Sequence, residues 1–316
     1  MRLLSSLTVF SLLAVAQTSQ PPTTVAPGEQ PIIKVTTRLV DLPVSVSDKS
    51  GKLLTNLPQK AFKVYENGVE QPIKQFLRED VPISLGIIVD NSGSMKEKRQ
   101  KVETASADLV KASNKQDEVF VVNFNDVAYL DVPMTKDIKA LEEGIARIDS
   151  RGGTAMRDAI SMSIDYLKEN GKKRKKVLLV VTDGNDNASA VTLEKLVNRA
   201  RQSEVLVYAI GLLSEEERRD ARLAKRALDA LTTESGGMSF YPKSVAEVDQ
   251  IALQVAHEIR NQYTITYTPT IQDMDGSYRQ IKVTVNAPGR PQVRTRAGYY
   301  ATPADSSKAT SQSSVH

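Results

Sequence analysis

The sequence predicts an α/β fold in which a doubly wound, mostly parallel sheet is covered by helices. Short apolar runs alternate along residues 81–261 with segments whose apolar residues recur at helical spacing. Such alternation is typical of βαβ units. The runs at 83–89 and 177–181 are apolar at consecutive positions, which indicates strands that are covered on both faces.

The residues on either side of this central region alternate apolar and polar positions instead. Residues 40–46 do so strictly, and Pro43 within them favours an edge strand, because proline cannot donate a ladder hydrogen bond. The N-terminal segment 31–80 and the C-terminal segment 262–301 are each too small for a core of their own. Because domain termini often lie close together, we expect the two segments to pack as one small β module.

Each element of this fold follows from a local pattern. The expected central strands are 83–89, 119–124, 127–132, 177–181, 205–210 and 238–241, and the expected helices are 97–112, 138–148, 156–167, 193–201, 215–231 and 245–259. In the flanks, Asn67-Gly68 predicts a hairpin and Asp275-Gly276 a turn, and 293–300 is read as the last strand.

The N-terminus resembles a secretory signal and predicts an exported protein, periplasmic or extracellular. Arg2 precedes a short apolar stretch that ends in an Ala-x-Ala site, so residues 1–16 are the expected signal peptide. Residues 17–30 are rich in Pro and Thr and predict a linker, and the Ser/Thr-rich residues 302–316 predict a disordered tail. We expect no membrane span after signal removal.

Composition excludes several classes of function. The chain of 316 residues has a formal charge of +4, which does not indicate a nucleic-acid partner, and it has no cysteine and two histidines, too few for a zinc cluster. The basic run 172–176 could meet an anionic partner, but a solvated helix end is the favoured interpretation. The chain lacks a G-x-S-x-G elbow and a phosphate-binding G-x-x-x-x-G-K-[ST] loop, so we expect no enzyme.

Oxygen-bearing side chains follow the apolar run 83–89. Asp90, Ser92 and Ser94 offer a carboxylate and two hydroxyls, and Gly93 between the serines allows a tight turn. Ligands of parallel sheets gather beyond the carboxyl ends of strands, and such oxygens suit a hard cation such as Mg²⁺.

This D-x-S-x-S pattern resembles the first motif of the metal-ion-dependent adhesion site of von Willebrand factor type A domains. Two further motifs of that family have counterparts in the expected order, Gly152-Gly153-Thr154 and Thr182-Asp183-Gly184. The resemblance implies a metal site with Ser92, Ser94 and Thr154 as hydroxyl ligands and Asp90 and Asp183 as carboxylates. It implies Mg²⁺, with Mn²⁺ or Ca²⁺ as alternatives, and a protein partner whose Asp or Glu completes the metal shell.

The layout as a whole is similar to bacterial exported proteins related to that family, which carry segments like 61–68 and 297–300. The expected function is therefore a divalent-cation-dependent protein-binding module for adhesion or assembly. An envelope scaffold whose metal only stabilises the fold is the alternative, and a metal-dependent hydrolase is disfavoured. No pattern sets an oligomeric state.

Simpler roles remain open for single residues of these motifs. Ser92 and Ser94 could cap the next helix, and Asn185 and Asp186 could either support the metal ligands or only shape their loop. Asp273-x-Asp275-Gly276 lacks the remaining ligands of a calcium loop, so a turn is favoured.

Overall fold

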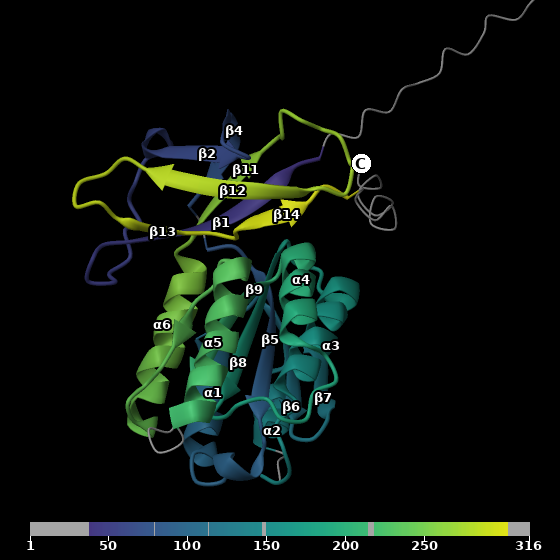
Figure 1. The fold of residues 1–316 in the computed structure, drawn as a ribbon. Helices are drawn as coiled ribbons and strands as arrows, with labels where there is room; N and C mark the ends of the chain where they lie inside the picture. The colour runs from purple at the N-terminus through teal and green to yellow at the C-terminus, as the bar shows by residue number, and fades with distance from the viewer. Residues whose placement is uncertain (1–37, 79, 113, 147–149, 214–217, 303–316) are drawn as a thin grey trace, which may run out of the picture. The chain divides into compact units, whose positions relative to one another are not determined.

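The computed structural model describes residues 38–78, 80–112, 114–146, 150–213 and 218–302, which fall within one compact unit. The expected signal peptide (1–16), the expected linker (17–30) and residues 303–316 of the expected tail lie outside the described residues. Helices and strands are labelled in Figure 1.

A six-stranded sheet forms the centre of the α/β region, in the order β10-β9-β8-β5-β6-β7 (Figure 1). Its strands are β5 (Ile83–Asp90), β6 (Glu118–Phe124), β7 (Ala128–Thr135), β8 (Lys175–Thr182), β9 (Leu206–Gly211) and β10 (Ser239–Phe240). All pairs are parallel except β6 with β7. Every residue of β5 and β6 is buried, as the consecutive apolar residues predict.

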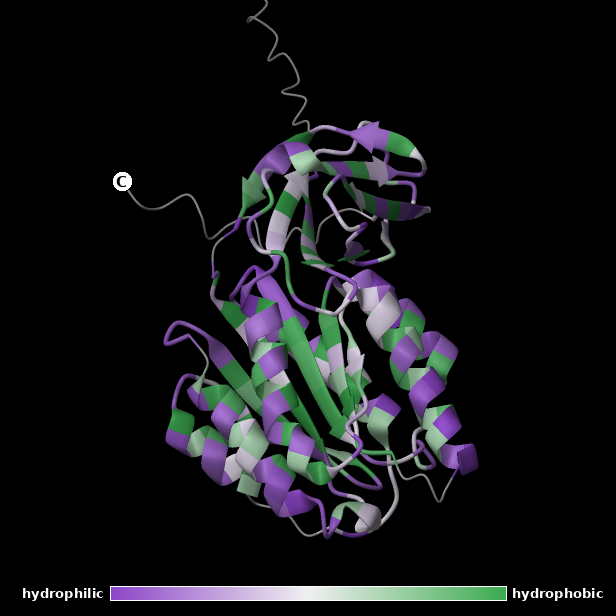
Figure 2. Cartoon of the chain, turned by 90° about the vertical axis from the view of Figure 1, so that its left-hand side faces the viewer, coloured by the Kyte–Doolittle hydropathy of each residue, from purple (hydrophilic) through white to green (hydrophobic). Residues whose placement is uncertain are grey.

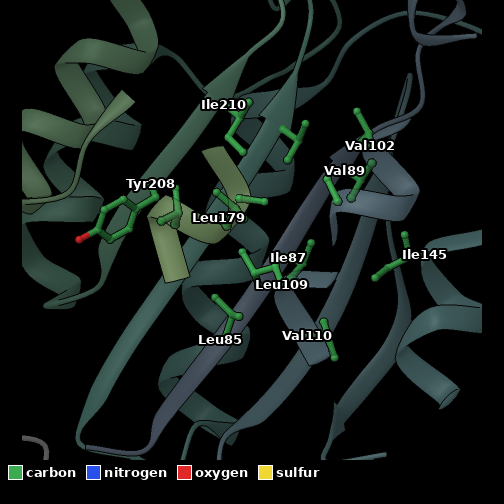
Figure 3. Packing of buried hydrophobic residues seen from close by; sticks show 14 of the residues in the cluster. Leu85, Ile87, Val89, Val102, Leu109, Val110, Ile145, Leu179, Tyr208 and Ile210 are labelled. Carbon is green, nitrogen blue, oxygen red and sulfur yellow. The ribbon is translucent and has the colours of Figure 1, made fainter. Parts of the chain in front are cut away.

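Helices cover both faces of this sheet, and each face has its own apolar core. On one face lie α1 (Arg99–Lys111), α2 (Ile138–Ala146) and α6 (Val248–Arg260), and on the other α3 (Met156–Asn170), α4 (Leu193–Ser203) and α5 (Arg218–Ser235). Figure 3 shows Leu85, Ile87 and Val89 of β5 among side chains of α1 in the first core. In Figure 2 the strands are mainly apolar and the helices mixed. The predicted doubly wound fold is confirmed.

The two flanking segments form two four-stranded antiparallel sheets that share one core. One has the order β13-β1-β11-β4, made of β1 (Val40–Ser47), β4 (Ile73–Leu77), β11 (Tyr263–Tyr267) and β13 (Gln292–Arg294). The other has the order β14-β12-β2-β3, made of β2 (Phe62–Glu66), β3 (Val69–Gln71), β12 (Tyr278–Val285) and β14 (Gly298–Tyr300). Strands from both flanks pair in each sheet, which confirms the predicted β module.

Two details of the β module differ from the sequence prediction. β1 is an inner strand, because Val40–Val44 pair with β11 and Ser45–Ser47 pair with β13. Only Ser45–Ser47 of β1 pair with β13. At Pro43 the strand therefore has no partner on that side, as on an edge strand, and proline is tolerated there. The expected last strand 293–300 is split in two, and β13 and β14 join different sheets.

The basic run 172–176 serves the fold. Arg174 pairs with Asp41 of β1, and Lys175 is buried and donates to the Ile259 carbonyl near the end of α6. A lysine side chain near a helix C-terminus can donate to one of the last carbonyl groups, which have no partner within the helix. None of the helices in the described ranges is long and apolar enough to cross a membrane.

Candidate metal centre

The candidate site lies where the order of the central sheet changes direction. From β5 the chain proceeds to β6 on one side, whereas β8 on the other side leads on to β9 and β10. Open α/β sheets bind ligands at such a switch point, beyond the carboxyl ends of the two strands. β5 ends at Asp90 and β8 at Thr182, so both the D-x-S-x-S motif and Asp183 lie at this position.

Asp90 is fully buried and both of its carboxylate oxygens are engaged. Oδ1 accepts a hydrogen bond of 2.8 Å from the Ser92 backbone N–H, and Oδ2 accepts one of 2.6 Å from the Thr182 hydroxyl. Burial raises the pKa of Asp90 to about 6, against the lowering effect of these hydrogen bonds, and the charge of Asp183 raises it further. Asp90 therefore orders the serine loop and contributes charge, rather than presenting a free oxygen.

Ser92, Ser94 and Asp183 are in direct contact. The two serine Oγ atoms are 3.2 Å apart, and the Ser94 hydroxyl donates to Asp183 Oδ1 at 2.8 Å. Neighbouring oxygen ligands of Mg²⁺ are separated by about 3 Å, since each lies about 2.1 Å from the metal. The serine pair matches that separation. Because the Ser94 hydroxyl acts as the hydrogen-bond donor to Asp183, the lone pairs of its oxygen can face a cation.

Thr154 enters the site from the loop before α3. It is buried, and a Cβ placed on Gly184 would lie 3.9 Å from its Oγ1. Its backbone is fixed by Asn187, whose Oδ1 accepts from Thr154 N–H at 2.8 Å. Among the described residues, the Thr154 hydroxyl makes no hydrogen bond, so a polar atom lies unused beside the Asp183-Gly184 turn.

Backbone hydrogen bonds join the loops that carry these residues. Asn91 N–H donates to the Phe124 carbonyl at 2.7 Å, and the Asn91 carbonyl accepts from Arg151 N–H at 2.9 Å. Gly93 N–H donates to the Gly152 carbonyl at 3.3 Å. The D-x-S-x-S loop and the Gly-Gly-Thr loop are therefore held in a fixed arrangement by the main chain, which is the condition for a preformed site.

The structure assigns fold-supporting contacts to the other motif residues. Asp186 accepts from Arg157 N–H at 2.7 Å and pairs with its guanidinium at 2.8 Å, which anchors the start of α3. Neither serine side chain caps the short 3-10 turn Gly93–Met95. Asp275 accepts from the backbone and hydroxyl of Ser277, as a turn requires.

Two residues at the site have roles that the sequence analysis missed. The Thr182 hydroxyl donates to Asp90 and orients its carboxylate. Thr182 can be found in the sequence because it is the first residue of the Thr-Asp-Gly motif. Lys98 lies just before α1, and its ammonium pairs with Asp183 Oδ2 at 2.6 Å. The residues around Lys98 do not indicate which distant carboxylate its ammonium meets, so this long-range pair has no local signal.

The donor set fits a divalent cation of the Mg²⁺ type. Burial is the main cause of the raised pKa of Asp90, and the charge of Asp183 adds to it. A positive charge between the two carboxylates would offset both effects, and three hydroxyls complete a set of hard oxygens. Within the described ranges, no group of three or more His, Cys, Asp or Glu side chains could hold a metal. A metal here would therefore depend on the hydroxyls as well as on the two carboxylates.

The chain is similar to a known protein family in its central region. Residues 85–185 match the family model of the von Willebrand factor type A domain. An uncharacterized protein of Borreliella burgdorferi is 28% identical over 109 residues, which cover 34% of this chain and 32% of the relative. This chain matches only about a third of the length of its curated relatives.

Two solved structures are similar over somewhat more than half of the chain. An aerotolerance-related membrane protein of Bacteroides fragilis is 18% identical with a TM-score of 0.46, covering 56% of this chain and 98% of the other. A proximal thread matrix protein from the mussel byssus is described with zinc in its metal-ion-dependent adhesion site (MIDAS motif). It is 19% identical with a TM-score of 0.45, and the match covers 57% of this chain and 48% of the other. The family-model match over 85–185 spans β5 to β8 and all three site loops, so this part of the chain is similar to a von Willebrand factor type A domain.

Proposed function

We propose that the chain is an exported, divalent-cation-dependent protein-binding module. The observation that carries the proposal is the contact of Ser92, Ser94 and Asp183 at the switch point of the sheet, with the unused Thr154 hydroxyl beside them. Ser92, Ser94 and Thr154 would hold the cation by hydroxyl oxygens, and Asp90 and Asp183 would balance its charge.

When bound, such a cation supplies an electrophilic position that accepts a carboxylate oxygen. Neutral hydroxyl ligands leave most of its positive charge uncompensated, so an Asp or Glu side chain of a partner protein is the matching ligand. Export rests on the signal-like pattern of residues 1–16. We favour binding over catalysis because both oxygens of Asp90 are engaged by Ser92 and Thr182, which leaves no free base there.

The alternative is an envelope scaffold whose metal only stabilises the fold. The ammonium of Lys98 already balances the charge of Asp183 within the chain itself, which argues against a large stabilising effect of a bound ion. The binding module needs the metal in order to bind its partner protein, whereas the scaffold does not.

The first experiment is a calorimetric titration of Mg²⁺ and Mn²⁺ into the metal-stripped protein. Thr154→Val removes a hydroxyl that makes no hydrogen bond among the described residues, so the fold should survive while metal affinity falls at least tenfold. Asp183→Asn should abolish binding, and Asp273→Asn, which removes one charge in an exposed loop, should bind as the wild type does. Equal affinity in all four proteins would refute the site.

A second experiment addresses the partner. The Mg²⁺-loaded protein is applied to an array of peptides that each carry one Asp or Glu, with Asn or Gln versions as matched controls. Capture that requires the carboxylate and disappears in EDTA would support the binding module. Metal binding without any carboxylate-dependent capture would leave the scaffold as the better account.

A further inference from the structure

Lys98 lies at an unfavourable position at the start of α1. It precedes α1 as the N-cap residue, makes no capping hydrogen bond with its side chain, and no acidic residue lies in the first turn. The amino end of a helix carries partial positive charge, so a lysine there is mildly destabilising. A compensating contact elsewhere is therefore expected for this side chain.

The contact is with Asp183. The Lys98 ammonium lies 2.6 Å from Oδ2 and 3.5 Å from the Leu212 carbonyl beyond β9. The side chain of Asp183 is fully shielded, whereas that of Lys98 is 25% exposed. With the Ser94 hydroxyl on Oδ1, both oxygens of Asp183 are occupied, one of them by a positive charge.

We propose that Lys98 is a tethered cation that occupies Asp183 in the metal-free chain and that a divalent ion must displace it. This inference rests on the proposed metal site. Two positive charges that share one buried carboxylate repel each other, so the Lys98 ammonium lowers the metal affinity of the site. Its partial exposure gives the ammonium a route to solvent once the ion binds.

The competing role is that of a positioning residue. In that case Lys98 would orient Asp183 for the metal, and its removal would weaken metal binding. The sign of the change in affinity therefore separates the two roles.

The test is a titration of Mn²⁺ and Mg²⁺ into wild type, Lys98→Met and Lys96→Met. Lys96 is exposed and lies two residues away, so its variant has the same net charge without a change at Asp183. We expect Lys98→Met to bind Mn²⁺ about tenfold more tightly or better, because a charge facing the ion is removed. Lys96→Met should stay within about twofold of the wild type.

Lys98→Met leaves a shielded carboxylate unpaired and could fail to fold without metal. Lys98→Gln keeps a donor for Asp183 without the charge, and it should show the same direction of change. Reductive methylation of the wild type gives an independent readout, since it requires access to the ammonium. Methylation of Lys98 should speed up severalfold when Mg²⁺ is added, while that of Lys96 stays constant.

The outcomes distinguish this inference from the proposed function. Unchanged or weaker affinity in both Lys98 variants, with a wild type that binds metal, overturns the displacement and leaves the metal site standing. If the Lys98 variants bind metal and the wild type does not, Lys98 blocks the site completely. That result supports this inference and overturns the metal dependence proposed for the native chain. No binding by any variant overturns both.

Discussion

Thr182 and Asp90, the last residues of two neighbouring central strands, are joined by a hydrogen bond of 2.6 Å from the threonine hydroxyl to Oδ2. The bond crosses between the first and third sequence motifs of the site. It gives a buried carboxylate a charge-assisted partner, which is a strong type of hydrogen bond.

Thr182→Val should therefore destabilise the metal-free protein at pH 7, where Asp90 is largely ionised. Removing a hydrogen bond to a buried charged group costs about 1–3 kcal/mol, and the valine keeps the shape of the side chain. Thr104→Val is the matched control, because that hydroxyl is exposed and bonds only to the Gln100 carbonyl of its own helix. Denaturant unfolding measures both changes. Equal effects of the two substitutions would contradict a special role for Thr182.

Lys175 predicts a pH dependence of stability. Burial lowers the pKa of Lys175 to about 7, against the raising effects of Asp80 and Glu258 and with Arg260 lowering it further. Between about pH 7 and pH 10 the unfolded chain then binds more protons at this position than the folded chain does. The free energy of unfolding should rise with pH across that window, by at most about 1.4 kcal/mol per pH unit.

Lys175→Met should remove this slope, since methionine fills the space without a titrating group. Lys172→Met is the control, because Lys172 belongs to the same basic run and is exposed. Unfolding free energies at pH 7, 8, 9 and 10 give the comparison. A slope that persists in Lys175→Met but not in Lys172→Met would contradict the assignment.

The sequence predicted most of the fold because each central element carries its own periodic pattern. The strand ending at Asp90 is apolar throughout, and the three motifs lie where parallel strands end. Contacts between distant segments were not predictable in the same way. Lys98 reaches Asp183 across 85 positions, and no local pattern encodes that pair.

The split of the last strand has a similar origin. Ala297 N–H bonds to the Glu234 carbonyl at the end of α5 instead of to a strand. Gly298 then begins β14, and any Cβ there would lie 2.3 Å from the Arg279 carbonyl. The apolar and polar alternation of 293–300 holds no trace of this interruption, because the interruption depends on neighbours supplied by the tertiary structure.

Gly86 in the middle of β5 should not tolerate a side chain. An added Cβ would lie 2.3 Å from Phe120 Cζ and 2.5 Å from Leu178 Cδ2, both fully buried. Gly86→Ala should lower the free energy of unfolding by about 1–3 kcal/mol, as overpacking of a core does. Gly93→Ala is the control, since its Cβ would meet only the Gly152 carbonyl at 3.9 Å. A stability of Gly86→Ala equal to that of the wild type would mean that the Phe120 and Leu178 side chains move aside at little cost.

Glu258 of α6 connects the central domain to the β module through a buried polar network. Its Oε1 accepts from Ser45 of β1 at 3.2 Å and from the Tyr208 hydroxyl of β9 at 2.9 Å, and it pairs with Arg294 of β13. Burial raises the pKa of Tyr208 well above its usual value, so its hydroxyl stays protonated and donates. Glu258 is only 4% exposed, so these partners take the place of water around its carboxylate.

Glu258→Leu should cost about 1–3 kcal/mol, because it leaves the Arg294 guanidinium, whose side chain is 29% exposed, and the Tyr208 hydroxyl without their acceptor. The double variant Glu258→Leu/Arg294→Met should recover part of that loss, since it removes both charges. Gln254→Leu, an exposed position of the same helix, should change the free energy of unfolding by less than about 0.5 kcal/mol. Strictly additive effects in the double-mutant cycle would show that the ion pair does not couple α6 to β13. A positive coupling energy would make the β module part of the cooperative unit that holds α6 in place.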